Sequence, residues 1–197
     1  MSDNADIDAD AVDTLLSALS QQLLARDERY SIIVIGGSGL LVLGVIARTT
    51  RDIDVVALVR DGSIVSPNPL PEGLLAATRL VAADFGLSED WLNTGPASLL
   101  DFGFPDGFLE RATQRAYGQA LEVLFASRED QIHFKLYAVV DQGAGKHLAD
   151  LQALAPSEAD LVRAARWTRT HDPSEGFRDV LLRVLSHFGV TNGSDLI

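Results

Sequence analysis

The sequence predicts an α/β (α+β) fold, in which a mixed sheet with flanking helices is followed by a helical C-terminal lobe. Three short apolar runs, rich in β-branched residues, predict buried strands at 30–35, 54–59 and 121–126. Helical periodicity dominates the chain after the third run. We therefore expect an α/β core at 1–126 and a helical lobe at 127–197.

Amphipathic spacing and capping residues predict the helices. Apolar residues within 10–26 recur at helical intervals and form one stripe. Ser127, followed within three residues by two acids, is typical of a helix start, and Gly143 is expected to end that helix. Further helices are expected at 40–47, 74–85, 146–155, about 157–170 and about 174–188. The proline-rich segment 60–73 is expected to be a loop, and the segment 86–107 is turn-rich.

The composition is that of an ordinary globular protein. Hydrophobic residues make up 47% of the chain, and no apolar run approaches the ~20 residues of a membrane-spanning helix. The acidic start differs from a secretory signal, and the absence of cysteine excludes disulfides and thiolate metal sites. We expect a cytoplasmic protein with no membrane partner. The net charge of -12 disfavours extensive non-specific binding to nucleic-acid phosphates, but it is compatible with nucleotide binding through a metal ion.

The motif that carries chemistry begins at the end of the first strand. This strand enters the turn Gly36-Gly37-Ser38, and after a short helix Asp52 and Asp54 open the second strand. The glycines allow a phosphate to approach the backbone closely, and Ser38 adds a hydroxyl. Alternate strand residues share a face, so the two carboxylates are expected to project together and bind one or two Mg²⁺. A tight strand–helix turn followed by solvated acids is the alternative interpretation.

This motif resembles the signature of the nucleotidyltransferase superfamily, a Gly-Ser turn followed after a short helix by Asp-x-Asp. Within the superfamily the sequence is similar above all to AbiEii-like enzymes, including the mycobacterial MenT-type toxins of toxin–antitoxin systems. Two later family motifs are matched in part, at Lys135-Leu-Tyr-Ala138 and His147-Leu-Ala-Asp150-Leu151. Gln142 stands near the place of an expected arginine, and His147 replaces the first acid of the last motif. The likeness covers roughly residues 30 to 155, in separate blocks.

The resemblance implies a nucleotidyltransferase-like sheet and a Mg²⁺-dependent enzyme that transfers NMP from an NTP. It also implies the 3′ end of tRNA as the acceptor, a block of translation and growth, and a cognate antitoxin protein as a partner. In the implied catalytic centre, Asp52 and Asp54 bind metal, Lys135 contacts nucleotide phosphate and Asp150 completes the centre. The alternatives are a lysine whose ammonium reaches the surface and a helix-surface acid.

Neighbouring residues leave further alternatives open. Arg48, which precedes the acids, is expected to bind phosphate, and a structural ion pair suits it equally. The resemblance makes Thr50 a candidate for regulatory phosphorylation, because some antitoxins of the family modify a hydroxyl just before the metal aspartates. A hydroxyl bonded to local backbone is the alternative there. A third metal carboxylate would come from Glu122 or Asp101.

Other acceptors and a non-catalytic role also remain open. An aminoglycoside-type small molecule or a protein hydroxyl (AMPylation) would accept NMP by the same chemistry. The departures at Gln142 and His147 leave room for a catalytically inactive nucleotide-binding partner protein. A row of arginines at 163, 166 and 169 suits either an RNA backbone or a solvated helix face.

Overall fold

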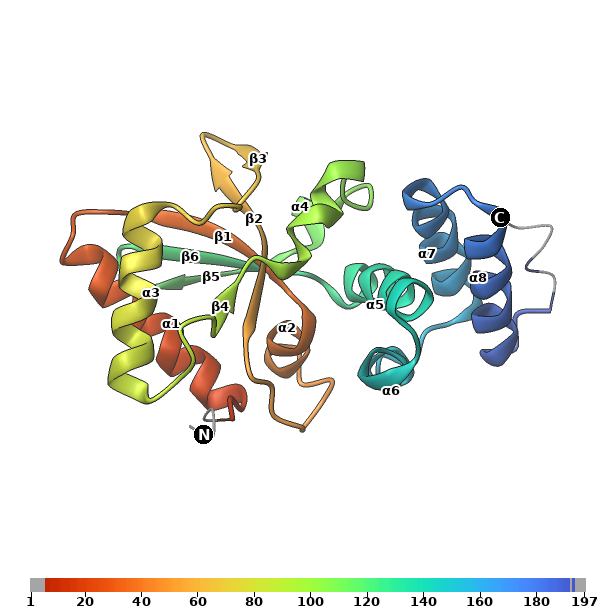
Figure 1. Ribbon diagram of the computed structural model, residues 1–197, viewed down its shortest axis with the longest axis horizontal. Coiled ribbons are helices and arrows are strands. Elements are labelled where there is room, and N and C mark those ends of the chain that lie inside the picture. The colour runs from red at the N-terminus through yellow and green to blue at the C-terminus, as the bar shows by residue number, and fades with distance from the viewer. Residues whose placement is uncertain (1–5, 192, 194–197) are drawn as a thin grey trace. The chain divides into compact units, whose positions relative to one another are not determined.

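The computed structural model describes residues 6–191 and residue 193, and the chain divides into two compact units (Figure 1). One unit spans Met1–Ser127 and contains the sheet, and the other spans Arg128–Ile197 and is helical. The expected α/β (α+β) fold class, a mixed sheet with flanking helices and a helical C-terminal region, is confirmed. Within the described residues, no helix is both long and apolar enough to cross a membrane.

A mixed sheet of six strands forms the centre of the first unit. Its main path runs β3–β2–β1–β6–β5, and β4 pairs with β2 off this path. The strands are β1 (Tyr30–Ile35), β2 (Ile53–Arg60), β3 (Ser63–Val65), β4 (Leu92–Asn93), β5 (Thr113–Tyr117) and β6 (Leu121–Phe125). β1 is antiparallel to β2 and parallel to β6, so β1 occupies the middle of the sheet. Its last four residues are buried, as expected of a central strand.

Helices cover the sheet, and their apolar faces build the core. α1 (Ala9–Leu24) and α3 (Glu72–Phe85) contact each other and share one cluster of buried side chains with β1, β2 and β6 (Figure 1). Ile53 and Val55 of β2 belong to this cluster, so Asp54 between them faces the opposite side of the sheet. The remaining helices of the unit are α2 (Gly36–Val42), the 3₁₀ helix η1 (Gly95–Phe102), which packs on β2, and α4 (Phe108–Arg111).

The second unit is built from helices packed around α5. The helices are α5 (Arg128–Gln142), α6 (Gly145–Ala153), α7 (Glu158–His171) and α8 (Glu175–His187), and the last three all contact α5. Ser157 begins α7 in a capping box with Asp160, and Ser174 begins α8 by accepting a hydrogen bond from the backbone N–H of Phe177. The helix starts expected at these two serines are therefore confirmed.

The structure corrects the expected local structure at the glycine turn. A helix at 40–47 was expected after the turn, but α2 begins at Gly36 itself and ends at Val42. Gly36 has a φ of 76°, a conformation that glycine adopts at no steric cost, so the chain passes directly from strand to helix. Residues 43–52 then form an irregular connection to β2, broken by a single β-bridge at Thr50.

Three short strands, β3, β4 and β5, lie in segments for which the sequence predicted no strand. Asp61 and Gly62 both have positive φ and form the two-residue turn that leads from β2 into β3, a hairpin for which the Asp-Gly pair is the sequence signal. The turn-rich segment contains β4 and η1. β5 carries no apolar pattern, because it lies at the sheet edge and three of its five residues are exposed.

Candidate functional site

The candidate site lies where β1 ends and β2 begins. The antiparallel pairing sets Ile35 opposite Asp54, so Gly36, the first residue after β1, lies beside the carboxylate. A Cβ atom built on Gly36 would overlap Asp54 Oδ2, and the positive φ of this residue also favours glycine. The Asp54 carboxylate therefore packs directly against the backbone of the turn.

Gly37 connects the turn to the second carboxylate. A Cβ atom on Gly37 would lie 2.9 Å from Thr50 Oγ1 and 3.9 Å from Arg48 Nη1. The Thr50 hydroxyl in turn donates a hydrogen bond of 3.2 Å to Asp52 Oδ1. Both aspartates of the motif are half-buried. The two carboxylates thus border the glycine pair, one directly and one through a threonine.

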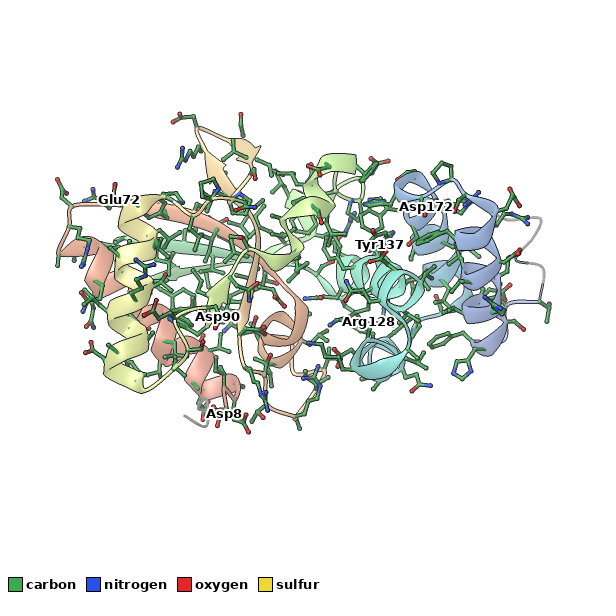
Figure 2. The ribbon with its side chains drawn as sticks, viewed as in Figure 1. Asp8, Glu72, Asp90, Arg128, Tyr137 and Asp172 are labelled. Atoms are coloured by element: carbon green, nitrogen blue, oxygen red, sulfur yellow. The ribbon has the colours of Figure 1, made fainter. Side chains whose placement is uncertain are left out.

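The N-terminal segment holds the backbone just before the acids. Ile7 N donates to Thr50 O at 2.8 Å, and Thr50 N donates to Ile7 O at 2.9 Å. Ile7 is entirely buried, and the next residue, Asp8, caps α1 by accepting from Ala11 N at 2.8 Å (Figure 2). Thr50 is 9% exposed. Its hydroxyl, the phosphorylation candidate, is therefore a buried partner of the Asp52 carboxylate rather than of local backbone.

Ser38 brings a buried hydroxyl to the same turn. Its side chain has no exposed surface, and its Oγ has no hydrogen-bond partner among the residues that the structure describes. A buried hydroxyl without a partner costs on the order of 1–3 kcal/mol. A ligand oxygen that accepts from Ser38 would remove this cost, which fits its expected place in a phosphate-binding turn.

β4 adds a neighbour that the sequence pattern does not mark. β4 runs parallel to β2 and sets Asn93 level with Asp54, on a different side of β2 from β1. Trp91 anchors β4, because it is fully buried and its indole N–H donates to Thr78 O at 3.0 Å. Asn93 becomes visible as a site residue only when the strand register is known.

Neither acid considered as a third metal ligand joins the two aspartates. Glu122 on β6 pairs with Ser31, and its carboxylate accepts from Ser31 Oγ at 3.0 Å. Asp54 lies opposite Ile35, which is four residues beyond Ser31 on β1. At the rise of a strand, Ser31 and Ile35 are about 13 Å apart. Asp101 is exposed on η1. Over residues 6–191 and 193, no group of three or more His, Asp or Glu side chains is placed to hold a metal ion.

Asp52 and Asp54 suit a magnesium ion that is shared with a substrate. Mg²⁺ in proteins is usually bound by one or two carboxylates, with substrate phosphates and water as its other ligands. Two half-buried carboxylates provide this donor set, and they border a buried glycine turn whose missing Cβ atoms leave room for them. A structural metal held by protein ligands alone would need more donors than these two.

In the second unit, the two residues implied by the family likeness form an ion pair. Lys135 Nζ on α5 donates to Asp150 Oδ2 on α6 at 2.8 Å. Lys135 is 5% exposed and Asp150 is 1% exposed, so neither fits the surface alternative. Because a single buried charge is costly, the pair stabilises the packing of α5 on α6 only while both members are present.

Two arginines of the row on α7 have partners within their own unit. Arg163 forms ion pairs with Glu129 at 3.2 Å and Asp160 at 2.6 Å. Arg169 donates to the backbone carbonyls of Asp172, Pro173 and Ser174 and so stabilises the turn between α7 and α8. These guanidinium groups are engaged in intramolecular contacts.

The fold and the site define a class of α/β protein in which a glycine turn lies against two strand-borne carboxylates. The sequence matches the model of a family described as nucleotidyltransferase of unknown function (DUF6036) over residues 10–153. This match covers well over half of the chain, and the protein belongs to this nucleotidyltransferase family. No curated protein and no solved structure gives a significant match. The expected superfamily is confirmed, and the finer likeness to AbiEii-like and MenT-type toxins stays a prediction.

Proposed function

We propose that the protein transfers a nucleoside monophosphate from an NTP to a hydroxyl acceptor. The observation that carries this proposal is the packing of the Asp54 carboxylate against Gly36, with Asp52 linked to Gly37 through Thr50. In the reaction, the acceptor oxygen bonds to the α-phosphorus, the bond to pyrophosphate breaks, and the hydroxyl proton passes to water. Such a transfer depends on positioning and charge neutralisation, which this arrangement of carboxylates and backbone can supply.

The glycine turn suits the polyphosphate of the substrate. Its backbone lacks Cβ atoms, the Arg48 guanidinium lies near Gly37, and the buried Ser38 hydroxyl lacks a partner in the described structure. Magnesium bound to Asp52 and Asp54 would neutralise charge on the phosphates. Beside the metal, the Arg48 guanidinium would add a positive charge from the protein to the phosphate-binding side of the turn.

We assign phosphate binding to Lys135 and the completion of the centre to Asp150. The family likeness supports both roles, and the ion pair is compatible with them. An ammonium group has three donors. Within the described residues, Lys135 uses them in one hydrogen bond, to Asp150. The carboxylate would therefore hold the ammonium in place while its other donors bind phosphate.

As acceptor we propose the 3′ end of tRNA, so that transfer would block translation and stop growth until a cognate antitoxin acts. The family likeness is the support for this choice. Phosphorylation of Thr50 would place up to two negative charges on a hydroxyl that now bonds to Asp52, and it would repel the incoming triphosphate. A small molecule and a protein hydroxyl are the competing acceptors.

Transfer of radiolabelled NMP tests the proposed function. The full chain is incubated with MgCl₂ and each α-labelled NTP in turn, against total tRNA, total protein and an aminoglycoside. We expect label on tRNA. Label on protein or on the antibiotic instead would assign one of the competing acceptors. Binding of Mg-NTP without any transfer would identify an inactive nucleotide-binding partner protein.

Matched aspartate variants show whether the site performs the transfer. Asp54→Asn should lower transfer by at least about 100-fold, because the variant loses the negative charge that binds the metal. Asp84→Asn, a change of the same kind at an exposed position on α3, should leave transfer unchanged. Full labelling by the Asp54→Asn variant would refute the assignment of the site.

A further inference from the structure

We propose that Asn93 is a substrate-binding residue, whose side-chain amide donates to a neutral hydroxyl oxygen next to the α-phosphate. This inference rests on the proposed function and names a contact of that same site. The hydroxyl is either on the ribose of the nucleotide or on the acceptor, and the two sources are separated by the experiment below.

The register of β4 places Asn93 on the same face as the metal-binding carboxylate. Ile53 pairs with Leu92, and both are buried in the core beneath α1 and α3. Asp54 pairs with Asn93. Because successive strand residues alternate in direction, this second pair faces away from that core. Both of its members are half-buried, so Asn93 stands beside Asp54 with part of its side chain accessible.

The hydrogen bond within its own turn orients the Asn93 amide. Asn93 Oδ1 accepts from the backbone N–H of Gly95 at 2.8 Å, which fixes the carbonyl end of the side chain. Nδ2 therefore points away from that contact and carries two N–H donors. No residue in the described part of the chain accepts a hydrogen bond from it. The amide is thus an oriented donor that has no acceptor among the described residues.

β4 is held firmly enough to position this donor. Trp91 is fully buried and bonded to Thr78 O, and its own carbonyl accepts from Ile53 N at 2.5 Å. These contacts hold Trp91, the residue that precedes β4, to α3 and to β2. A donor on such a support keeps its direction when a substrate binds, which is the condition for specific recognition.

The geometry of nucleotidyl transfer indicates what the donor meets. Asp54 has the glycine turn on its β1 side and Asn93 on its β4 side. If the β- and γ-phosphates lie at the turn and the α-phosphate at Asp54, both the ribose and an acceptor attacking opposite to pyrophosphate lie toward β4. The cation Arg48 lies near the turn, whereas the group at β4 is a neutral amide. Because Asn93 lies on the β4 side of Asp54 and the turn on the β1 side, we assign its amide to a hydroxyl of the ribose or the acceptor and not to the β- or γ-phosphate.

Two variants of Asn93 separate substrate binding from a role in the turn. Asn93→Asp keeps the shape of the side chain and an oxygen that accepts from Gly95 N, but it replaces the amide donor. Asn93→Ser keeps a smaller acceptor without adding a charge near Asp54. If Asn93 only shapes the turn, Asn93→Ser should behave as the wild type, whereas Asn93→Asp also places a negative charge beside Asp54. The unfolding midpoint of each variant verifies that the fold is intact.

The experiment measures the Kd of the full chain for Mg-tripolyphosphate and for each Mg-NTP by calorimetry, and then kcat and KM for transfer. The uncharged variant Asn93→Ser should bind Mg-tripolyphosphate as the wild type does. If the ribose is the partner, Mg-NTP binding weakens by about 2- to 13-fold, the range expected for a lost hydrogen bond between neutral groups. If the acceptor is the partner, the Kd for Mg-NTP is unchanged and kcat/KM for the acceptor falls by a similar factor.

Two results would overturn the inference while leaving the proposed function intact. One is an Asn93→Ser variant with unchanged nucleotide binding and unchanged transfer. The other is an equal loss of affinity for tripolyphosphate and NTP, which would place the contact on the phosphates. A wild-type chain that binds no Mg-NTP, by contrast, would remove the proposed function itself and the inference with it.

Discussion

At the scale of single residues, the two glycines of the turn have different neighbours. Gly36 lies against a carboxylate and needs a positive φ, whereas Gly37 lies against a hydroxyl and near a guanidinium group. A side chain at Gly36 would displace Asp54, and one at Gly37 would displace Thr50, the hydrogen-bond partner of Asp52. The shape of the turn is therefore set by the room that the acidic residues require.

Replacing Gly36 by alanine should impair both stability and nucleotide binding. The backbone strain of an L-residue at this φ costs roughly 1–2 kcal/mol, and the overlap with Asp54 Oδ2 adds to that cost. Gly62→Ala is the matched control, because Gly62 has a φ of 75° and no atom within 4 Å of a built Cβ. Urea unfolding and Mg-NTP calorimetry measure both effects. Equal effects of the two variants on binding would show that Asp54 tolerates a side chain beside it.

Lys135 allows a structural role to be separated from a phosphate contact. Lys135→Met removes the cationic partner of the buried Asp150, and we expect unfolding to become easier by about 3–5 kcal/mol. The double variant Lys135→Met/Asp150→Leu should recover most of that stability, since apolar groups replace both charges. If Lys135 binds phosphate, the double variant stays deficient in Mg-NTP binding although it is stable. Recovery of binding together with stability would leave the ion pair a purely structural role.

At the scale of elements, the sequence pattern predicted the strands and helices that have a recognisable local pattern of apolar residues. The strands β1, β2 and β6 and the helix α1 have apolar patterns long enough to recognise, and the expected ranges match to within a few residues. β4 has two residues and β5 is polar, so neither has such a pattern, and both exist because they pair with β2 and β6. Pairing depends on the tertiary structure, which a propensity does not encode.

The same distinction applies to the candidate site. The glycine turn and the Asp-x-Asp pair are short-range motifs, and the structure places their residues side by side. Asn93 is remote in sequence from Asp54, and only the parallel pairing of β4 with β2 makes them neighbours. The start of α2 at Gly36 was likewise hidden, because four residues rich in glycine predict a turn when helix propensity alone is considered.

Tyr117 joins the edge strand β5 to α1, and its hydrogen bond should contribute to stability in a pH-dependent manner. Its hydroxyl donates to Asp13 Oδ1 at 2.5 Å. Burial, followed by this hydrogen bond, raises the pKa of Tyr117 above its usual value. A raised pKa in the folded state means that the contribution is complete below pH 10, the unfolded pKa, and is lost as the pH rises through the folded pKa.

Tyr117→Phe should therefore lower the free energy of unfolding by about 1 kcal/mol at pH 7. The variant should also lose less stability than the wild type as the pH rises above about 10. Tyr30→Phe is a second test of the same linkage, because burial and Glu28 raise the pKa of Tyr30 to about 12, and this variant should also lose less stability than the wild type above about pH 10. Urea titrations across this pH range compare the three proteins. Parallel curves for wild type and Tyr117→Phe would contradict the expected linkage.

At the scale of the whole molecule, the family match and the division into units do not coincide. The match covers 10–153 and so includes most of the sheet unit together with α5 and α6, but neither α7 nor α8. The shared sequence therefore includes both the glycine turn with its aspartates and the buried pair of Lys135 and Asp150. The residues that the family model matches are therefore distributed over both compact units.

We expect the net charge of the molecule to make nucleotide binding dependent on a divalent cation. A protein with a charge of -12 repels a triphosphate, and the carboxylates of the site add to that repulsion when no metal is bound. Removal of Mg²⁺ by EDTA should weaken ATP binding by at least about 10-fold, which calorimetry measures directly. Asp52→Asn should reduce the benefit of adding Mg²⁺. Equal affinity for ATP with and without Mg²⁺ in the wild type would argue against a metal-mediated contact.

The paired backbone hydrogen bonds between Ile7 and Thr50 lead us to expect that the proposed transfer depends on residues far from the motif in sequence. Removing the chain up to Asp8 would delete both hydrogen bonds and the N-cap of α1. The connection 43–52, which carries Asp52, would then no longer be held at Thr50. Proteolytic trimming at this end would then silence the enzyme without touching any group that meets the nucleotide.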